Sequence, residues 1–558
     1  MEVSFSSSGT SATDNDSDFE PSPKKQKINK NRVCLQLSMN DILDKWVPFL
    51  TRYKVSVRAE TSLLASLFSI AGVNLNTVPV SKSGLHKNRK IVIENEAEMV
   101  REENLDKVRD LKVVLHFDTK LVKHYRKITE KKMSETVERL ALSLSSPQVN
   151  EPLDFLLGVL EIESSKGQDQ AIAIQNILEY YELTDQIIGC SADTTASNTG
   201  KYNGAIKFLV DHVLQRPVLW LLCTTYLKGT YHMQWIIFKE QQNRHQEQYI
   251  KISKITGEKY KKELKTWINC FFFNYDRVEF KVGTTFHTRV IDTKNFCETA
   301  LKRDCFQRGD YKALCELLVI YLEGHVPGFQ FKQPGAHHYA RFMADCLYLL
   351  IMQLTSKINS KLNKSEKDML QMSTDFIVTF YGSYFLKSPI AAQAPSNDLD
   401  AFKLSLEMMS NELYKSKYGP LAKKLHSSLV RHSWYLTPQL VILSIANGDL
   451  DSKERAEIAL KLISFDPPSP DEFSTEQPDS PTHILPMSVL PDIVTEESWL
   501  IFTYLGISRE MIKTWIDDNF NVSNVSYTNF QNQVANLAVV NDRAESHSTC
   551  SRFCGSNP

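Results

Sequence analysis

The stretch GCSADTTASNTG, residues 189–200, ends an apolar run with a single aspartate, Asp193, and continues into small polar residues. A carboxylate at the end of a buried strand costs free energy unless its charge is compensated. Either local hydrogen bonds that cap a turn or a bound cation would compensate it. A second acidic residue at a matching position of the fold would favour the cation.

The segments around this stretch alternate between strand and helix patterns. Three Val- and Leu-rich segments predict strands, at residues 110–120, 137–146 and 153–164. Apolar residues at helical spacing then predict a helix over 167–184. A fourth strand, a second helix and a fifth strand complete the series, at residues 185–195, 203–215 and 217–227. This order is that of an RNase H-like fold, an α/β fold with a mixed sheet.

In such a fold the first and fourth strands are neighbours, so Asp118, at the predicted end of the first strand, would face Asp193. Two close carboxylates raise each other's pKa unless divalent cations bridge them. Magnesium, a hard cation that binds oxygen, suits this arrangement. Each aspartate taken alone is more often a strand-end or capping residue than a metal ligand. Both interpretations therefore stay open at this point.

Three motifs, VVLHFDTK, GCSADTTASNTG and LWLLCTTYL (residues 113–120, 189–200 and 219–227), together resemble transposases of the hAT type and their relatives. In that family a large helical insertion interrupts an RNase H-like core. The resemblance spans roughly residues 109–546 and is carried by the strand motifs. It implies that Asp118 is the first catalytic acid and Asp193 the second, because Asp193-Thr-Thr-Ala-Ser-Asn198 is similar to the family's Asp-Asn-Ala-Ser-Asn.

The same resemblance implies a third acid after the insertion, and Glu545 in VVNDRAESHS is the candidate. An ordinary helix glutamate is the alternative. Together the three acids would hold two Mg²⁺ ions for two-metal DNA strand cleavage and transfer. The implied partner is double-stranded DNA, such as the ends of a transposable element, and a homo-oligomer is left open.

Three departures from the family favour an alternative function, that of a catalytically inactive nuclear DNA-binding or protein-interaction relative. The family's Cys-x-x-His is missing, since Tyr226 stands where the histidine would follow Cys223. The last residues after Glu545 are polar and aperiodic, as in a truncated chain, and no zinc-binding DNA reader precedes the core. A helical scaffold with no nucleic-acid role is a third interpretation.

Two segments of the helical region predict contacts with nucleic acid. Residues 239–265 are rich in basic residues and contain Tyr249 and Tyr260, a composition that suits a phosphate backbone and stacked bases. The lysines proposed there are Lys251, Lys254, Lys261 and Lys262; the alternative is the solvated face of a helix. The pair Arg341-Phe342 resembles an Arg-Trp pair that hAT-type transposases carry on an insertion helix, with core packing as the alternative.

The chain divides by composition into five regions. Residues 1–35 predict a disordered tail with a basic cluster of Lys24, Lys25 and Lys27 that resembles a nuclear-import signal, with a solvated basic tail as the alternative. The other regions are a helical region at 36–108, the core at 109–235, a helical insertion at 236–530 with a Pro-rich loop at 465–493, and a return to the core at 531–558. Whether this last region is truncated is left open.

The composition of the sequence, and the motifs that it lacks, limit the classes of protein to which the chain can belong. The net charge of −1 over 558 residues means that any basic surface must be local. Ten singly spread cysteines indicate reduced thiols in an intracellular protein, and the apolar run 342–354 indicates a buried helix, not a membrane span. Residues 394–414 predict a helix capped near Asn397 or Asp398. No Gly-rich phosphate loop, nucleophile elbow or zinc-protease motif is present.

Overall fold

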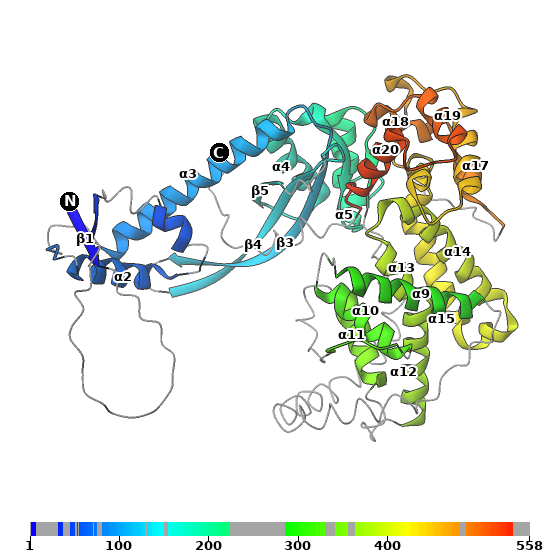
Figure 1. Cartoon of the computed structure of the whole chain (residues 1–558), viewed down its shortest axis with the longest axis horizontal. Coiled ribbons are helices and arrows are strands. Elements are labelled where there is room, and N and C mark those ends of the chain that lie inside the picture. The colour runs from blue at the N-terminus through cyan, green and yellow to red at the C-terminus, as the bar shows by residue number, and fades with distance from the viewer. Residues whose placement is uncertain are drawn as a thin grey trace, which may run out of the picture. The chain divides into compact units, whose positions relative to one another are not determined.

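The computed structural model of the chain is mixed α/β, with a five-stranded mixed sheet and many helices (Figure 1). The chain divides into two compact units, Met1–Lys107 and Val108–Pro558. The structure describes residues 2–6, 32–36, 45–50, 53, 55–70, 72–74, 81–128, 131–149, 155–222, 285–304, 306, 309–322, 324–329, 341–354, 363–478 and 487–539.

The first unit combines a two-stranded sheet with helices. Strand β1 (Glu2–Ser6) pairs antiparallel with β2 (Arg32–Gln36). Sequence alone predicted no strand in residues 1–35; the register pairs Val3 with Leu35 and Phe5 with Val33. The helices α2 (Val57–Ile70) and α3 (Lys82–Val108) contribute to a small core made of Val47, Leu64, Phe68 and Leu85.

The five-stranded sheet of the second unit has the order β5-β4-β3-β6-β7. Its first three strands form antiparallel neighbours, whereas β3 with β6 and β6 with β7 are parallel. The expectation that the first and fourth strands of this region lie side by side is thereby confirmed. The strands are β3 (Val113–Ile128), β4 (Lys131–Ser145), β5 (Phe155–Ile162), β6 (Ile187–Ser191) and β7 (Leu219–Trp220).

The strand β3 is longer than the sequence predicted. Asp118 was expected at its end, yet β3 continues for ten residues to Ile128 because β4 pairs with it along this whole length. Asp118 instead follows the part of β3 that pairs with β6, which stops at His116. The prediction that the strand ends at Asp118 was therefore wrong, although the pairing of β3 with β6 stops two residues before Asp118.

The helices between the strands are close to their predicted positions. The first, α4 (Gly167–Tyr180), packs on β5, where a Cβ built on Gly158 would lie 3.8 Å from Ile177 Cδ1. The predicted second helix begins as α6 (Ala205–Phe208) and continues as a π-helical turn to Leu214. The described part of the predicted fifth strand ends at Leu222.

Most described residues after 284 form helices that share one large apolar core with Val114, Ile188, Leu219 and Leu221 of the sheet region. The predicted buried helix at 342–354 is confirmed as α11 (Arg341–Leu354), which buries Cys346 and Leu350. The others before residue 450 include α9 (Thr285–Arg303), α10 (Gly309–Tyr321), α12 (Lys364–Phe376), α13 (Gly382–Lys387), α14 (Ala394–Ser410), α15 (Glu412–His432) and α16 (Pro438–Val441).

The start of α14 differs from the prediction of a cap at Asn397 or Asp398. The helix begins at Ala394 with Pro395 in its first turn, and both polar residues are buried inside it. Asn397 donates to the carbonyl oxygen of Tyr384 at 2.8 Å, and Asp398 accepts from the hydroxyl of the same tyrosine at 2.7 Å. Tertiary partners therefore use the side chains that the sequence assigned to a cap.

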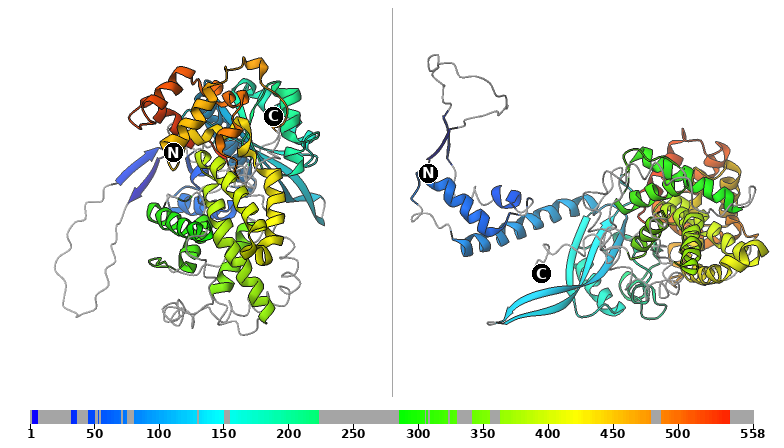
Figure 2. Two further views of the ribbon diagram at one scale, coloured as in Figure 1. Left: turned by 90° about the vertical axis from the view of Figure 1, so that its right-hand side faces the viewer. Right: turned by 90° about the horizontal axis from the view of Figure 1, so that it is seen from below.

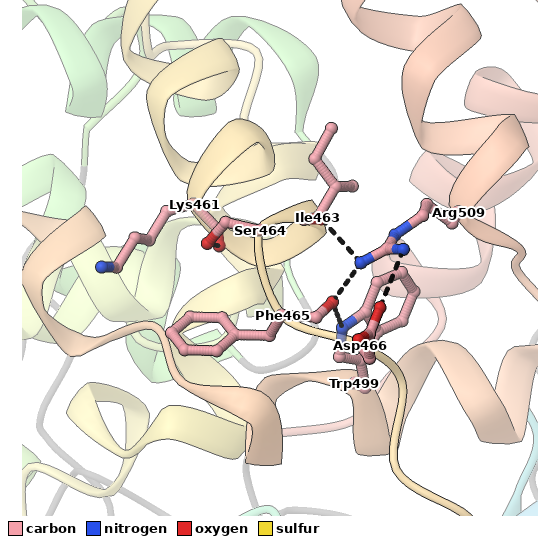
Figure 3. A network of polar contacts seen from close by, with 7 residues as sticks. All are labelled: Lys461, Ile463, Ser464, Phe465, Asp466, Trp499 and Arg509. Atoms are coloured by element: carbon pink, nitrogen blue, oxygen red, sulfur yellow. Dashed lines mark hydrogen bonds and ion pairs between the residues drawn. The ribbon is translucent and has the colours of Figure 1, made fainter.

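An arginine clamp joins the last helices (Figure 3). Arg509 donates to the carbonyl oxygens of Ile463 and Phe465, at 2.8 and 2.6 Å, and contacts Asp466 at 3.0 Å. Trp499 donates to the same Phe465 oxygen at 3.2 Å. Because the carbonyls past a helix C-terminus lack helical partners, the clamp satisfies them. It ties α17 (Ser452–Ile463) to α18 (Trp499–Leu505) and α19 (Arg509–Asp517).

These C-terminal helices return to the sheet. Tyr504 of α18 donates to the carbonyl oxygen of Pro217, just before β7. Arg216 contacts the Tyr504 hydroxyl at 3.5 Å and the Thr184 carbonyl at 3.0 Å. Asn536, after α20 (Val525–Ala535), donates to the carbonyl of Val149. The predicted Pro-rich loop is described in part, with 3-10 turns at Pro470–Glu472 and Leu490–Ile493.

Across the described residues, no helix has both the length and the apolar character that crossing a bilayer requires.

The approach of α4 to the loop before α6 predicts that Gly167 cannot be replaced. A Cβ on Gly167 would lie 2.1 Å from the carbonyl oxygen of Asn203, so backbone would have to move. We expect Gly167→Ala to lower the free energy of unfolding by about 1–3 kcal/mol, the range of overpacked sites, measured by urea denaturation. Gly448→Ala is the control, since its Cβ would meet nothing within 4 Å. Equal stability of the two variants would contradict the prediction.

Candidate functional site

Asp118 lies within β3, and Asp193 lies two residues beyond the end of the neighbouring strand β6. The last parallel pair of β3 and β6 joins His116 with Ser191, and each aspartate follows its member of that pair by two residues. Side chains two positions apart point to the same face of a strand. Both aspartates are half-buried. The register thus places Asp118 on the same face of β3 as His116, and Asp193 lies in the loop that follows the paired end of β6.

Asp193 is held by its own loop. Its Oδ1 accepts hydrogen bonds from Thr195 N at 3.2 Å, Thr195 Oγ1 at 2.8 Å and Asn198 Nδ2 at 2.6 Å. Within the described residues no hydrogen bond reaches Oδ2. The sequence posed a choice between local hydrogen bonds and a cation, and the structure shows the hydrogen bonds on one carboxylate oxygen. The other oxygen is left for a further ligand.

Glycines fix the loop that follows Asp193. A Cβ on Gly204 would lie 2.5 Å from Gly200 N and 2.8 Å from Asn198 O, and one on Gly167 would lie 2.6 Å from Ser197 O. Side chains at these positions would displace backbone. The loop around Asn198, which donates to Asp193, is therefore closely packed and holds the carboxylate in one position.

A buried polar row leads to the two aspartates. His116 pairs with Ser143 of β4 on one side and Ser191 of β6 on the other, and its Nε2 lies 2.8 Å from Ser145 Oγ. The hydroxyls of Ser143 and Ser191 are buried and have no hydrogen-bond partner among the described residues. Sequence reasoning missed this row. Its signal was polar residues at alternate positions inside otherwise apolar strands.

The only described thiol near this edge is unsuited to act as a nucleophile. Burial raises the pKa of Cys190 to about 12, although the nearby Arg216 charge opposes the shift. A thiol is nucleophilic as the thiolate, which this pKa suppresses at neutral pH. Cys190 is fully buried within β6 and serves packing.

The hydroxyl of Tyr435 contacts two segments that lie far apart in the sequence. Its hydroxyl lies 2.9 Å from the carbonyl oxygen of Leu222, beyond β7, and 3.2 Å from that of Val539, and can donate to either. Next to it Trp434 stacks on Trp220, with ring centroids 6.0 Å apart. Residues 222 and 539 thus meet at the end of the sheet that carries Asp193, because Trp220 pairs with Cys190.

A buried carboxylate, that of Asp398, lies next to Tyr435. Asp398 accepts hydrogen bonds from the Tyr384 hydroxyl and from the backbone of Tyr435. Burial raises the pKa of Asp398 to about 7, and both hydrogen bonds oppose the shift. Its Oδ2 is buried with no hydrogen-bond partner among the described residues. A group in this environment favours its neutral form.

The remaining predicted site residues are only partly described. Arg341 begins α11 and Phe342 follows it, but their side chains are outside the described part of the structure. Outside the described residues lie Glu545, Lys251, Lys254, Lys261, Lys262, Lys24, Lys25 and Lys27. Among the described residues, no group of three or more His, Cys, Asp or Glu side chains is arranged to hold a metal ion.

Compared with known proteins, the chain matches no model of a protein family, and no curated protein matches its sequence.

Tyr435 should contribute to stability through its hydroxyl. Tyr435→Phe would leave two buried carbonyl oxygens without this donor, which costs about 1–3 kcal/mol in the free energy of unfolding. Thermal denaturation would measure the loss. Tyr202→Phe is the control because the Tyr202 side chain is 85% exposed, and we expect no more than about 0.5 kcal/mol there. An unchanged Tyr435→Phe melting temperature would contradict the role of this hydroxyl.

Asp398 should make stability depend on pH. Its pKa is about 7 in the folded chain and 3.8 ordinarily, so the folded state holds a proton between these values that the unfolded state loses. The free energy of unfolding therefore falls as pH rises from about 4 to 7, by roughly 4 kcal/mol in total. Asp398→Asn should remove this fall.

The measurement is the difference in unfolding free energy between Asp398→Asn and the unsubstituted chain across this range. The difference is needed because burial lowers the pKa of His432 to about 4, which gives the opposite trend in both proteins. Asp517→Asn, at an exposed position in the helix α19, is the control. A difference that stays constant with pH would show that Asp398 does not titrate in this way.

Proposed function

We propose that the chain is a transposase-like protein with an RNase H-like core that cleaves or transfers DNA strands with Mg²⁺, derived from a cut-and-paste DNA element. One observation carries the proposal. Asp118 and Asp193 each follow by two residues the last parallel pair of β3 and β6. Neighbouring strands lie about 4.8 Å apart, so acids at matching positions can share cations.

The order of the sheet and the path of the chain support the same proposal. An insertion within a fold requires the chain to leave and rejoin the core at nearby points. The contact of Tyr435 with both Leu222 and Val539 meets this requirement. Glu545 follows Val539 by six residues, a reach of at most about 20 Å. It is the acid we propose to complete the site.

The donor set fits a hard cation. Asp193 offers Oδ2 while its Oδ1 is held by Thr195 and Asn198, and Asp118 supplies a second carboxylate. Bound Mg²⁺ would stabilise negative charge on the attacking and departing oxygens of a phosphoryl transfer. The described residues hold the two carboxylates in position. The loop packed by glycines fixes Asp193, and the pairing of β3 with β6 fixes where Asp118 lies along the strand.

A catalytically inactive relative that binds DNA or protein in the nucleus is the second candidate. The hydrogen bonds to Asp193 Oδ1 favour it, since Thr195 and Asn198 already compensate part of the charge without a metal. The missing histidine after Cys223 points the same way. Nuclear localisation through Lys24, Lys25 and Lys27 belongs to both candidates and rests on the sequence.

The test of catalysis is Asp193→Asn. The amide keeps an oxygen for Thr195 and Asn198 but removes the charge that would bind Mg²⁺, so the fold should persist while cleavage is lost. We expect metal-dependent nicking of labelled DNA to fall at least about 100-fold, with little change in melting temperature. Asp211→Asn is the control, because that acid forms a surface ion pair with Lys207.

Nicking that persists in Asp193→Asn would rule out this site as its source. Salt-sensitive DNA binding by the unsubstituted chain, with no nicking under Mg²⁺ or Mn²⁺, would establish the inactive relative instead. Neither binding nor nicking would reject both candidates.

A further inference from the structure

The sheet face that carries Asp118 also carries two cationic side chains. The strands β3 and β4 lie side by side (Figure 2), and their register sets Ala141 opposite Asp118 and Arg139 opposite Lys120. Opposite residues of an antiparallel pair lie on one face, and so do residues two positions apart on one strand. Asp118, Lys120 and Arg139 therefore share one face of two neighbouring strands.

Arg139 is a buried residue whose charged end has no partner. Only 7% of Arg139 is exposed. Among the described residues its side chain takes part in no hydrogen bond and no ion pair. In the described part of the structure its nitrogens are not among the fully buried atoms that lack a partner, so the exposed part of Arg139 includes the guanidinium. The hydrocarbon stem is thus buried, while a ligand from solution can reach the charged end.

The acids nearest to Arg139 in the register do not neutralise it. Glu161 of β5 lies opposite Arg139, and Asp118 of β3 is its diagonal neighbour. Within the described structure neither carboxylate forms an ion pair with the guanidinium. The residue on its other side, Lys120, has the same charge, and like charges opposite each other on paired strands are destabilising. A bound anion would compensate both positive charges at once.

A phosphate group has the chemistry that these two cations lack. The guanidinium presents N–H donors in a planar fork that matches two phosphate oxygens, and an ammonium adds a point charge. Diagonal neighbours on paired strands are about 7–8 Å apart, a distance that long side chains can span. A phosphate bound by Arg139 would therefore lie close to Asp118, where the proposed reaction takes place.

We infer that Arg139, together with Lys120, binds a phosphate of the DNA backbone beside the phosphate at Asp118. The inference rests on the proposed function, because DNA is the substrate there, and it adds a residue that positions the strand. Arg139 itself would not touch the reacting atoms. The competing explanation is that Arg139 only packs on the sheet and that water alone solvates its charge.

The experiment compares Arg139→Gln, Arg139→Lys and Arg58→Gln in the full chain. Glutamine removes the charge, whereas lysine keeps the charge and loses the planar fork. Arg58 is an exposed arginine of α2, so its replacement removes the same charge at a different place. Binding to a labelled DNA duplex is measured over a series of salt concentrations. Ca²⁺ is present at a fixed concentration, because it binds the same oxygen ligands as Mg²⁺ and would neutralise the two aspartates.

We expect Arg139→Gln to bind duplex DNA about tenfold more weakly, the loss expected for one charge-assisted contact. The slope of log K against log salt should decrease by up to about 0.9, the value for one phosphate. Arg139→Lys should restore this slope but only part of the affinity, because an ammonium cannot form the paired hydrogen bonds. Arg58→Gln should bind like the unsubstituted chain.

A purely structural role of Arg139 gives a different result. Arg139→Gln would then lower the melting temperature while the salt slope of its folded fraction stays unchanged, and this outcome overturns the inference. Should Arg139→Gln fail to fold by circular dichroism, Lys120→Gln takes its place, since Lys120 lies opposite Arg139 at a half-buried position. An unchanged salt slope in Lys120→Gln would likewise overturn the inference.

The two proposals fail separately. If Arg139→Gln binds DNA normally while nicking still depends on Asp193, the proposed function stands and the phosphate site falls. If Arg139→Gln loses one phosphate contact and the unsubstituted chain never nicks DNA, the phosphate site stands and catalysis falls. A full chain that binds no duplex DNA rejects both.

Discussion

The parallel pairing of β3 with β6 is the interaction on which the rest of the second unit depends. It joins Val114 with Gly189 and His116 with Ser191. Asp118 and Asp193 each come two residues after this last pair, so the pairing fixes where they lie along the two strands. A shift of β3 by one residue would move Asp118 to the opposite face of the sheet, because side chains alternate along a strand. Gly189 permits the close neighbour on the other side, where its Cβ would lie 3.1 Å from Leu219 O.

The second constraint is the closure of the chain at the end of the sheet. The hydroxyl of Tyr435 contacts the carbonyl of Leu222, beyond β7, and that of Val539. Buried carbonyls need partners, so this contact favours one arrangement of the helices over others. Asp398 reinforces it through the backbone of Tyr435. The arginine clamp at Arg509 holds the returning helices to one another.

Hydrogen bonds within the loop compensate part of the negative charge of Asp193, and they do so without a bound metal. Thr195 and Asn198 donate to one carboxylate oxygen, so the turn is stable by itself. Such local hydrogen bonds compensate a charge only in part, since the second oxygen keeps its ligand capacity. These hydrogen bonds do not depend on a bound metal. The loop is therefore compatible with either of the two proposed functions.

The sequence by itself determined which segments form the sheet, because runs of Val, Leu and Ile bounded by polar turns predict strands regardless of context. It also singled out Asp193, whose Asp-Thr-Thr-Ala-Ser-Asn run forms its own hydrogen bonds locally. Only the tertiary structure decided where β3 ends, since strand length depends on a partner, and β4 carries it to Ile128. Tertiary structure likewise turned Asp398 from an expected helix cap into an acid whose pKa is raised by burial and whose partner is Tyr384, 14 residues away in sequence. Contacts of Tyr435 with Leu222 and Val539 span 213 and 104 residues, a separation over which no local pattern in the sequence can specify a partner.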